Sequence, residues 1–279
     1  MSVDDSSHGS HDGSHHFVHC DVTSYESQRQ LFRKALSLST THTLNTVIAN
    51  AGVGMVTDFT ELPETVDEDP PEPNLTTLDV NLTGVIYTAK LALHHFRRNS
   101  DDEDRHLLFI GSVASFASSP GLLGLYTASK HAVLGFFRCL YMYPGPHATG
   151  VRMNLLCPYF VATPILPRSA LLLLSGLDLA LCEDVVEAAA RLTCLKRANG
   201  RCLVVAPRSS GGIQEMDAAI MHAVEPFSMR LVMALQSKDR AAALIRGLLI
   251  GPTRNLIVGV LVVGLVLALG WTALAKAFG

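Results

Sequence analysis

Tyr126-Thr127-Ala128-Ser129-Lys130 is the stretch around which the chain is organised. Tyr126 and Lys130 are four residues apart, so in a helix spanning 125–141 their side chains share one face and can meet. Upstream, the short apolar run 107–110 predicts a buried strand, and Ser112 follows its end. The sequence therefore predicts a strand-end hydroxyl near a phenol and an ammonium group.

These three groups are suited to proton transfer. The positive charge of Lys130 is expected to favour the phenolate of Tyr126 and to lower its pKa from about 10 towards working pH. A phenol tuned in this way can act as a general acid or base, and Ser112 can hold a carbonyl or alcohol oxygen beside it. A Tyr and a Lys at this spacing also occur on ordinary surface helices, so the pair alone is a weak signal.

The longer run 126–135, combined with the upstream Ser112, resembles the short-chain dehydrogenase/reductase family. It is most similar to fungal, hydroxyaverantin dehydrogenase-like members, and the resemblance extends from Phe17 to about Pro207. It implies that Ser112, Tyr126 and Lys130 form the catalytic set. It also implies that Asn81 is the helix asparagine that supports a proton-relay water.

The same resemblance implies an NAD or NADP cofactor. The residues that it places around this cofactor are Asp21 near the adenine, Asn50, Ala51 and Gly52 in a turn beside the cofactor, Lys130 at the nicotinamide ribose, and Val161 and Thr163 at the carboxamide. Tyr159 stands where the family usually has a glycine after proline, so we expect this loop to be shaped differently.

The family's Gly-rich phosphate turn, Thr-Gly-x-x-x-Gly-x-Gly, does not occur in this sequence. The family's first strand, the helix after it and its second strand, which would precede Phe17, are also absent from this sequence. A helix N-terminus normally binds the pyrophosphate, so we expect compromised binding of the dinucleotide, and the choice between NAD and NADP cannot be read. The missing strands would lie between Phe17–Cys20 and Thr46–Ala49, and we expect these two segments to pair directly with each other.

Strands alternate with helices along the chain, which predicts an α/β, Rossmann-like, mostly parallel sheet with helices on both faces, truncated at its N-terminus. The expected strands are 17–20, 46–49, 107–110, 151–157 and 202–205. The expected helices are 24–38, 74–98, 125–141 and 183–193, and the acidic, proline-rich segment 61–72 is expected to be a solvated loop. We assign 17–212 to this incomplete oxidoreductase domain and 213–254 to a helical connector.

The composition excludes several classes of function. The net charge is only −3, which gives no electrostatic case for binding nucleic acid. The six cysteines are dispersed, as expected for reduced thiols. Residues 1–16 are rich in Ser, His, Gly and Asp, and we expect a disordered polar N-terminal segment and no metal site, because the histidines lack regular ligand spacing.

Residues 255–276 are predicted to form a transmembrane helix. Leu256 to Ala275 contains no charged residue, and twenty helical residues span about 30 Å, the thickness of a bilayer core. Arg240, Arg246 and Arg254 precede the segment, which predicts a membrane-anchored protein with its N-terminal domain in the cytosol. The alternative is a buried helix or one that forms an oligomer.

Two classes of function follow. The first is an NAD(P)-dependent oxidoreductase that interconverts a secondary alcohol and a ketone on a small apolar substrate, which could be lipid-like or polyketide-like. The second is an inactive, membrane-anchored remnant or binding protein, favoured by the missing phosphate turn, or a truncated gene model of an active enzyme. A homo-oligomer is compatible with either class.

Overall fold

The computed structural model describes residues 15–216, except for 55, 57–58, 60–61, 118–122, 143, 146, 167–173 and 175. The chain divides into two compact units, Met1–Met221 and His222–Gly279, and every described residue belongs to the first. None of the helices in the described part is long and apolar enough to cross a membrane. The helix predicted for 255–276, its cytosolic orientation and most of the polar segment 1–16 lie outside the described residues and stay predictions.

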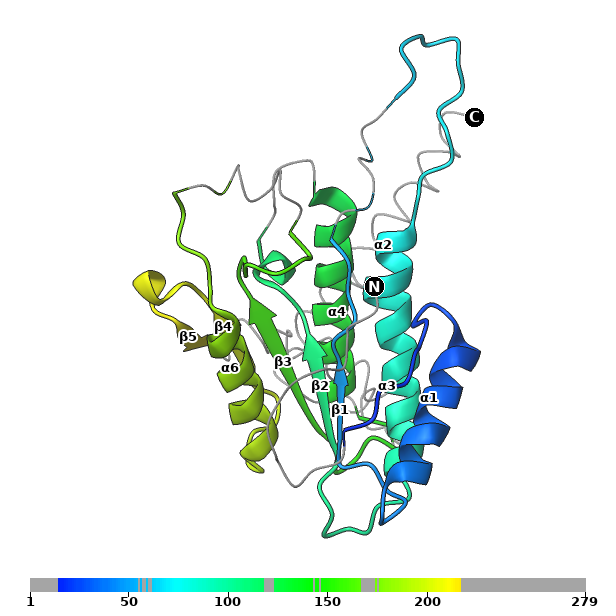
Figure 1. Ribbon diagram of the computed structural model, residues 1–279, viewed down its shortest axis with the longest axis vertical. Coiled ribbons are helices and arrows are strands. Elements are labelled where there is room, and N and C mark those ends of the chain that lie inside the picture. Colours follow the sequence, from blue (N-terminus) through cyan, green and yellow to red (C-terminus); the bar gives the residue numbers. More distant parts are fainter. Residues whose placement is uncertain are drawn as a thin grey trace, which may run out of the picture. The chain divides into compact units, whose positions relative to one another are not determined.

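The described sheet has five strands in the spatial order β1-β2-β3-β4-β5 (Figure 1). They are β1 (Thr46–Ala49), β2 (His106–Ile110), β3 (Arg152–Pro158), β4 (Cys202–Val205) and β5 (Ile213–Glu215). The first four are parallel, which confirms the predicted sheet. β5 is antiparallel to β4, so the predicted helical connector is wrong at its start: Gly211 and Gly212 adopt positive φ and turn the chain back.

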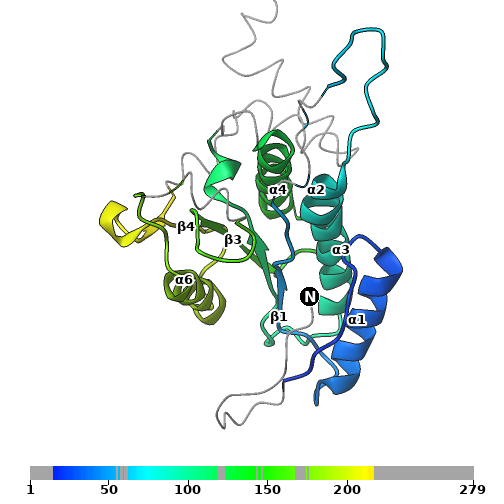
Figure 2. The same ribbon diagram turned by 45° about the horizontal axis from the view of Figure 1, so that its top comes forward.

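Helices cover both faces of the sheet (Figure 2). One face packs against α1 (Tyr25–Leu38), α3 (Gly84–Phe96) and α4 (Gly124–Met142), and the other packs against α6 (Cys182–Cys194). Neighbouring residues of one strand point to opposite faces. Accordingly, Leu107 and Phe109 of β2 belong to the first core and Leu108 to the second.

The predicted helices form, and their ends lie within about two residues of the expected positions. Ser24 caps α1 by accepting a hydrogen bond from the backbone N–H of Ser27 at 3.2 Å, as its residue type predicts. The helix expected over 74–98 forms in three parts: α2 (Thr76–Leu78), a π-helical stretch (Asp79–Thr83) and α3. The π-helical stretch carries Asn81, and such local widening is frequent at functional sites.

The strand predicted at Phe17–Cys20 does not form, and its expected pairing with β1 is wrong. Phe17 is exposed, and β1 is an edge strand of the described sheet. The physical reason lies in the anchoring of the next residues. Gln28 donates hydrogen bonds to the carbonyls of Val22 and Gly84, at 2.7 and 2.9 Å, and holds the segment before α1 against α3.

Arg152 connects three elements at the opposite end of the sheet from the carboxyl ends of the strands. Its buried guanidinium binds both carboxylate oxygens of Asp104, at 2.7 and 2.6 Å. It also donates to four backbone carbonyls at and beyond the end of α6, those of Leu192, Thr193, Leu195 and Ala198. The hydrogen bonds from Arg152 hold the pKa of Asp104 below its usual value. This cation complements the carbonyl-rich end of the helix.

We expect Arg152→Met to lower the free energy of unfolding by about 3 to 5 kcal/mol, because Asp104 and the carbonyls lose a buried partner. The matched control is Arg191→Met, which removes the exposed ion pair with Glu187 and should cost less than about 1 kcal/mol. Urea unfolding followed by circular dichroism measures both. Equal losses in the two variants would contradict this assignment.

Candidate active site

The carboxyl ends of β1, β2 and β3 bring the predicted site residues to one edge of the sheet. Asn50, Ala51 and Gly52 follow β1, Ser112 follows β2, and Val161 and Thr163 follow β3. Tyr126 and Lys130 lie on α4, which packs on the same three-strand region. In open α/β sheets this edge is where ligands bind.

Ser112 is positioned by a tight junction between β2 and β3. A Cβ at Gly111 would lie 2.8 Å from Cys157 Sγ and 3.0 Å from Ser115 Oγ, so only glycine fits there. The Oγ of Ser112 accepts a hydrogen bond from the N–H of Ala114 at 3.2 Å and lies 3.5 Å from the carbonyl oxygen of Pro158. These contacts fix the hydroxyl at the edge of the sheet.

Tyr126 lies near enough to Ser112 for the serine to affect its pKa. Burial raises the pKa of the Tyr126 phenol above its usual value, and the hydrogen bond between the Ser112 and Tyr126 side chains opposes part of this rise. The predicted direction was wrong, since we expected a lowered pKa. That both hydroxyls bind one oxygen of a ligand stays a prediction.

Lys130 does not act on Tyr126 in the expected way. Its Nζ donates to the carbonyl oxygen of Ile110 at 3.1 Å and lies 5.7 Å from the centroid of the Tyr126 ring. The ammonium therefore faces the ring and a backbone carbonyl. Burial lowers the pKa of Lys130 from 10.5 to about 8.

Asn81 is completely buried and connects the loop after β1 to the helix α4. Its Oδ1 accepts from the N–H of Val53 at 2.8 Å, and its Nδ2 donates to the carbonyl of Val53 at 2.9 Å and to Ser129 Oγ at 3.3 Å. Ser129 in turn donates to the carbonyl of Tyr126 at 2.6 Å. The Asn81 side chain thus positions the loop and one turn of α4; a water relay at this residue stays a prediction.

The loops after β1 and β3 approach each other closely. A Cβ at Gly52 would lie 3.3 Å from Asn81 Oδ1 and 3.8 Å from Lys130 Nζ, and one at Gly54 would lie 3.1 Å from the carbonyl of Ile165. The N–H of Thr163 donates to the carbonyl of Val161 at 2.8 Å, which forms a tight turn. Of these residues Gly52 lies beside Lys130, and the contacts of Gly52, Val161 and Thr163 with a nicotinamide stay predictions.

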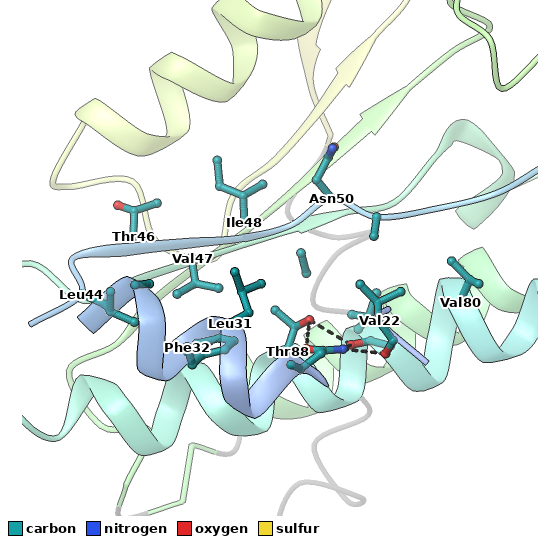
Figure 3. A pocket seen from close by; sticks show the side chains of 16 residues that line it. Val22, Leu31, Phe32, Leu44, Thr46, Val47, Ile48, Asn50, Val80 and Thr88 are labelled. Atoms are coloured by element: carbon teal, nitrogen blue, oxygen red, sulfur yellow. Dashed lines mark hydrogen bonds between the residues drawn. The ribbon is translucent and has the colours of Figure 1, made fainter. Parts of the chain in front are cut away.

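A pocket lies beside the open edge of β1, between α1 and α3 (Figure 3). Val47 points into it, together with Leu31 and Phe32, while Thr46, Ile48 and Asn50 point the other way.

Ala51 and Val22 also line the pocket, and Asp21, which the resemblance places near the adenine, directly precedes Val22. Asp21 is exposed, and a hydrogen bond from the Thr23 hydroxyl lowers its pKa. The described residues build no Gly-rich turn here, so the pyrophosphate end of a dinucleotide is not matched.

Two contributors were missed in the sequence. Ser129 lies inside the quoted stretch Tyr126–Lys130, and its spacing from Tyr126 could have suggested the hydrogen bond within the helix. Cys157 touches the junction at Gly111 and lies 3.8 Å from the Sγ of Cys202, which only the register of β3 and β4 reveals. Ser129 thus holds the helical turn that carries Tyr126, and Cys157 packs against the junction at Gly111.

The fold and the site together define an oxidoreductase class. Residues 6–170 match the family model described as short chain dehydrogenase. The chain therefore belongs to the short-chain dehydrogenase/reductase family, which confirms the resemblance seen in the sequence.

Two dehydrogenases and one solved structure are similar to this chain over most of its length. A 5'-hydroxyaverantin dehydrogenase of Dothistroma septosporum is 34% identical over 225 residues, covering 74% of this chain and 72% of that protein. The 5'-hydroxyaverantin dehydrogenase stcG of Emericella nidulans is 31% identical over 221 residues, covering 72% of both. The ligand-free structure of Thermoplasma acidophilum aldohexose dehydrogenase matches with a TM-score of 0.53 at 22% identity, over 67% of this chain and 75% of that one, which shows the shared fold.

The buried ammonium predicts a pH-dependent stability. With a pKa of about 8 in the folded protein and 10.5 in the unfolded chain, the unfolded chain binds more protons between these values. Lys130 therefore makes the free energy of unfolding rise by about 3 kcal/mol from pH 8 to pH 10.5. In urea unfolding curves, the Lys130→Met variant should not show this increase in the free energy of unfolding. The control variant Lys90→Met, which changes an exposed lysine, should still show it. The same pH slope in both variants would contradict the burial argument.

Proposed function

We propose that this oxidoreductase interconverts a secondary alcohol and a ketone with NAD or NADP, on a small apolar substrate. The observation that carries the proposal is the placement of Ser112, Tyr126 and the buried Lys130 at one edge of the sheet, where Ser112 affects the pKa of the phenol and Lys130 Nζ lies 5.7 Å from the centroid of its ring. Two hydroxyls that converge on one oxygen, with a nearby cation, are the parts that a carbonyl–alcohol proton transfer requires. The named relatives, which are dehydrogenases of a hydroxylated compound, support this reading.

Each side chain has a separate task in this reaction. Ser112 donates a hydrogen bond to the substrate oxygen, and Tyr126 gives or takes the proton at that oxygen. Lys130 contributes positive charge to the site and would contact the nicotinamide ribose. Gly52, Val161 and Thr163 would hold the nicotinamide end, where the bound cofactor supplies or accepts the hydride.

We expect Tyr126→Phe to reduce turnover of a secondary alcohol by about 10² to 10⁴-fold, because the variant keeps the ring and loses the proton. Cofactor oxidation or reduction followed by absorbance measures the rate. The control is Tyr25→Phe on α1, which should leave the rate unchanged. Unchanged turnover in Tyr126→Phe would exclude the phenol as the acid or base.

We also propose that residues 1–279 bind NADH and NADPH weakly, with dissociation constants above about 10⁻⁴ M. A half-matched site must still overcome the cost of ordering a long, flexible ligand. Fluorescence titration with each nucleotide tests this, and micromolar affinity would contradict it. Absence of both binding and turnover would favour the second candidate, a non-catalytic binding protein, which the lack of a Gly-rich turn in the described residues favours.

A further inference from the structure

Tyr159 places an aromatic ring at the edge of the candidate site, and the proton-transfer scheme does not use it. The residue directly follows β3 and is 37% exposed. No hydrogen bond to its hydroxyl is present within the described part of the chain. A large aromatic side chain left partly open at this edge is available to contact a ligand.

The backbone places Tyr159 close to the hydroxyl of Ser112. The carbonyl oxygen of Pro158 lies 3.5 Å from Ser112 Oγ. Across a trans peptide, the next Cα lies about 2.8 Å from that oxygen, so the Cα of Tyr159 lies within about 6 Å of Ser112 Oγ. A ligand whose oxygen binds Ser112 therefore lies near the backbone of Tyr159.

The segment that carries this ring is held on both sides. The N–H of Tyr159 donates to the carbonyl of Val205 at 2.9 Å, and the carbonyl of Phe160 accepts from Ala180 at 2.9 Å. The Tyr159 ring packs edge-to-face on the Phe160 ring, with centroids 5.0 Å apart. The ring is consequently anchored to the sheet and does not depend on a free loop for its position.

We propose that Tyr159 is a specificity-determining residue that favours planar, aromatic ketones and alcohols by ring-to-ring packing. This inference rests on the proposed function, because it assumes that Ser112 holds the substrate oxygen. Aromatic rings gain from offset or edge-to-face packing beyond the area that they bury, whereas a saturated ring gains only from burial. The structure thus assigns substrate selection to the residue that follows Pro158.

The test compares two probes of similar size, 1-tetralone, which is aromatic, and 1-decalone, which is saturated. Ligand-observed NMR on the full chain, in the same detergent for every variant, measures each dissociation constant without requiring turnover. We expect Tyr159→Leu to raise the constant for 1-tetralone roughly three- to tenfold and to change that for 1-decalone less than twofold. Tyr159→Phe should keep the affinity for 1-tetralone.

The matched control is Tyr25→Leu, since Tyr25 is 40% exposed and also packs edge-to-face on a neighbouring ring, that of Tyr87. It should bind both probes as the unaltered chain does. Loss of 1-tetralone affinity in both variants, or in neither, would overturn the inference, as would the absence of any binding. Selective binding at Tyr159 without turnover of any ketone would instead reject the proposed function, so the two failures are distinguishable.

Discussion

The buried side chain of Asn81 is the constraint on which the geometry of the site depends. A fully buried amide must have hydrogen-bond partners, and here they come from Val53 and Ser129. Because Val53 follows β1 and Ser129 lies on α4, the amide fixes the distance between a strand end and a helix. Gly52 can then lie beside Lys130 without a side chain intervening.

The same arrangement explains how the site forms next to an open edge of the sheet. Among the described strands, β1 has one neighbour, β2, and its other edge lies beside the pocket between α1 and α3. The packing of α1 on α3 supports this pocket through Gln28 and Thr88, since the hydroxyl of Thr88 donates to the side-chain oxygen of Gln28 at 2.8 Å. The contacts of Ser112 with Pro158 and of Lys130 with Ile110 are made by β2, β3 and α4, so they do not require a further strand beside β1.

Local patterns in the sequence predicted the helices, strands β1 to β4 and the position of Ser112 just after a strand. Periodicity and capping act within a few residues, so α1 and its Ser24 cap were predictable. Membership of a sheet is not local: Phe17–Cys20 has strand-like residues but pairs with no strand of the described sheet. The three-residue strand β5 depends on a glycine turn and one neighbouring strand, a signal too short to recognise.

The charge state of the site could not be predicted, because it depends on where Nζ of Lys130 points. Spacing of four residues brings Lys130 and Tyr126 together, but the ammonium binds the carbonyl of Ile110, and burial governs both groups. Burial disfavours the charged form of each, raising the pKa of the phenol and lowering that of the amine. At neutral pH the phenol keeps its proton, which is the form that ketone reduction uses. Alcohol oxidation needs the phenolate, and a raised pKa makes that form more costly. In the proposed reaction, burial therefore makes the phenolate of Tyr126, the form that accepts a proton, the more costly of its two forms.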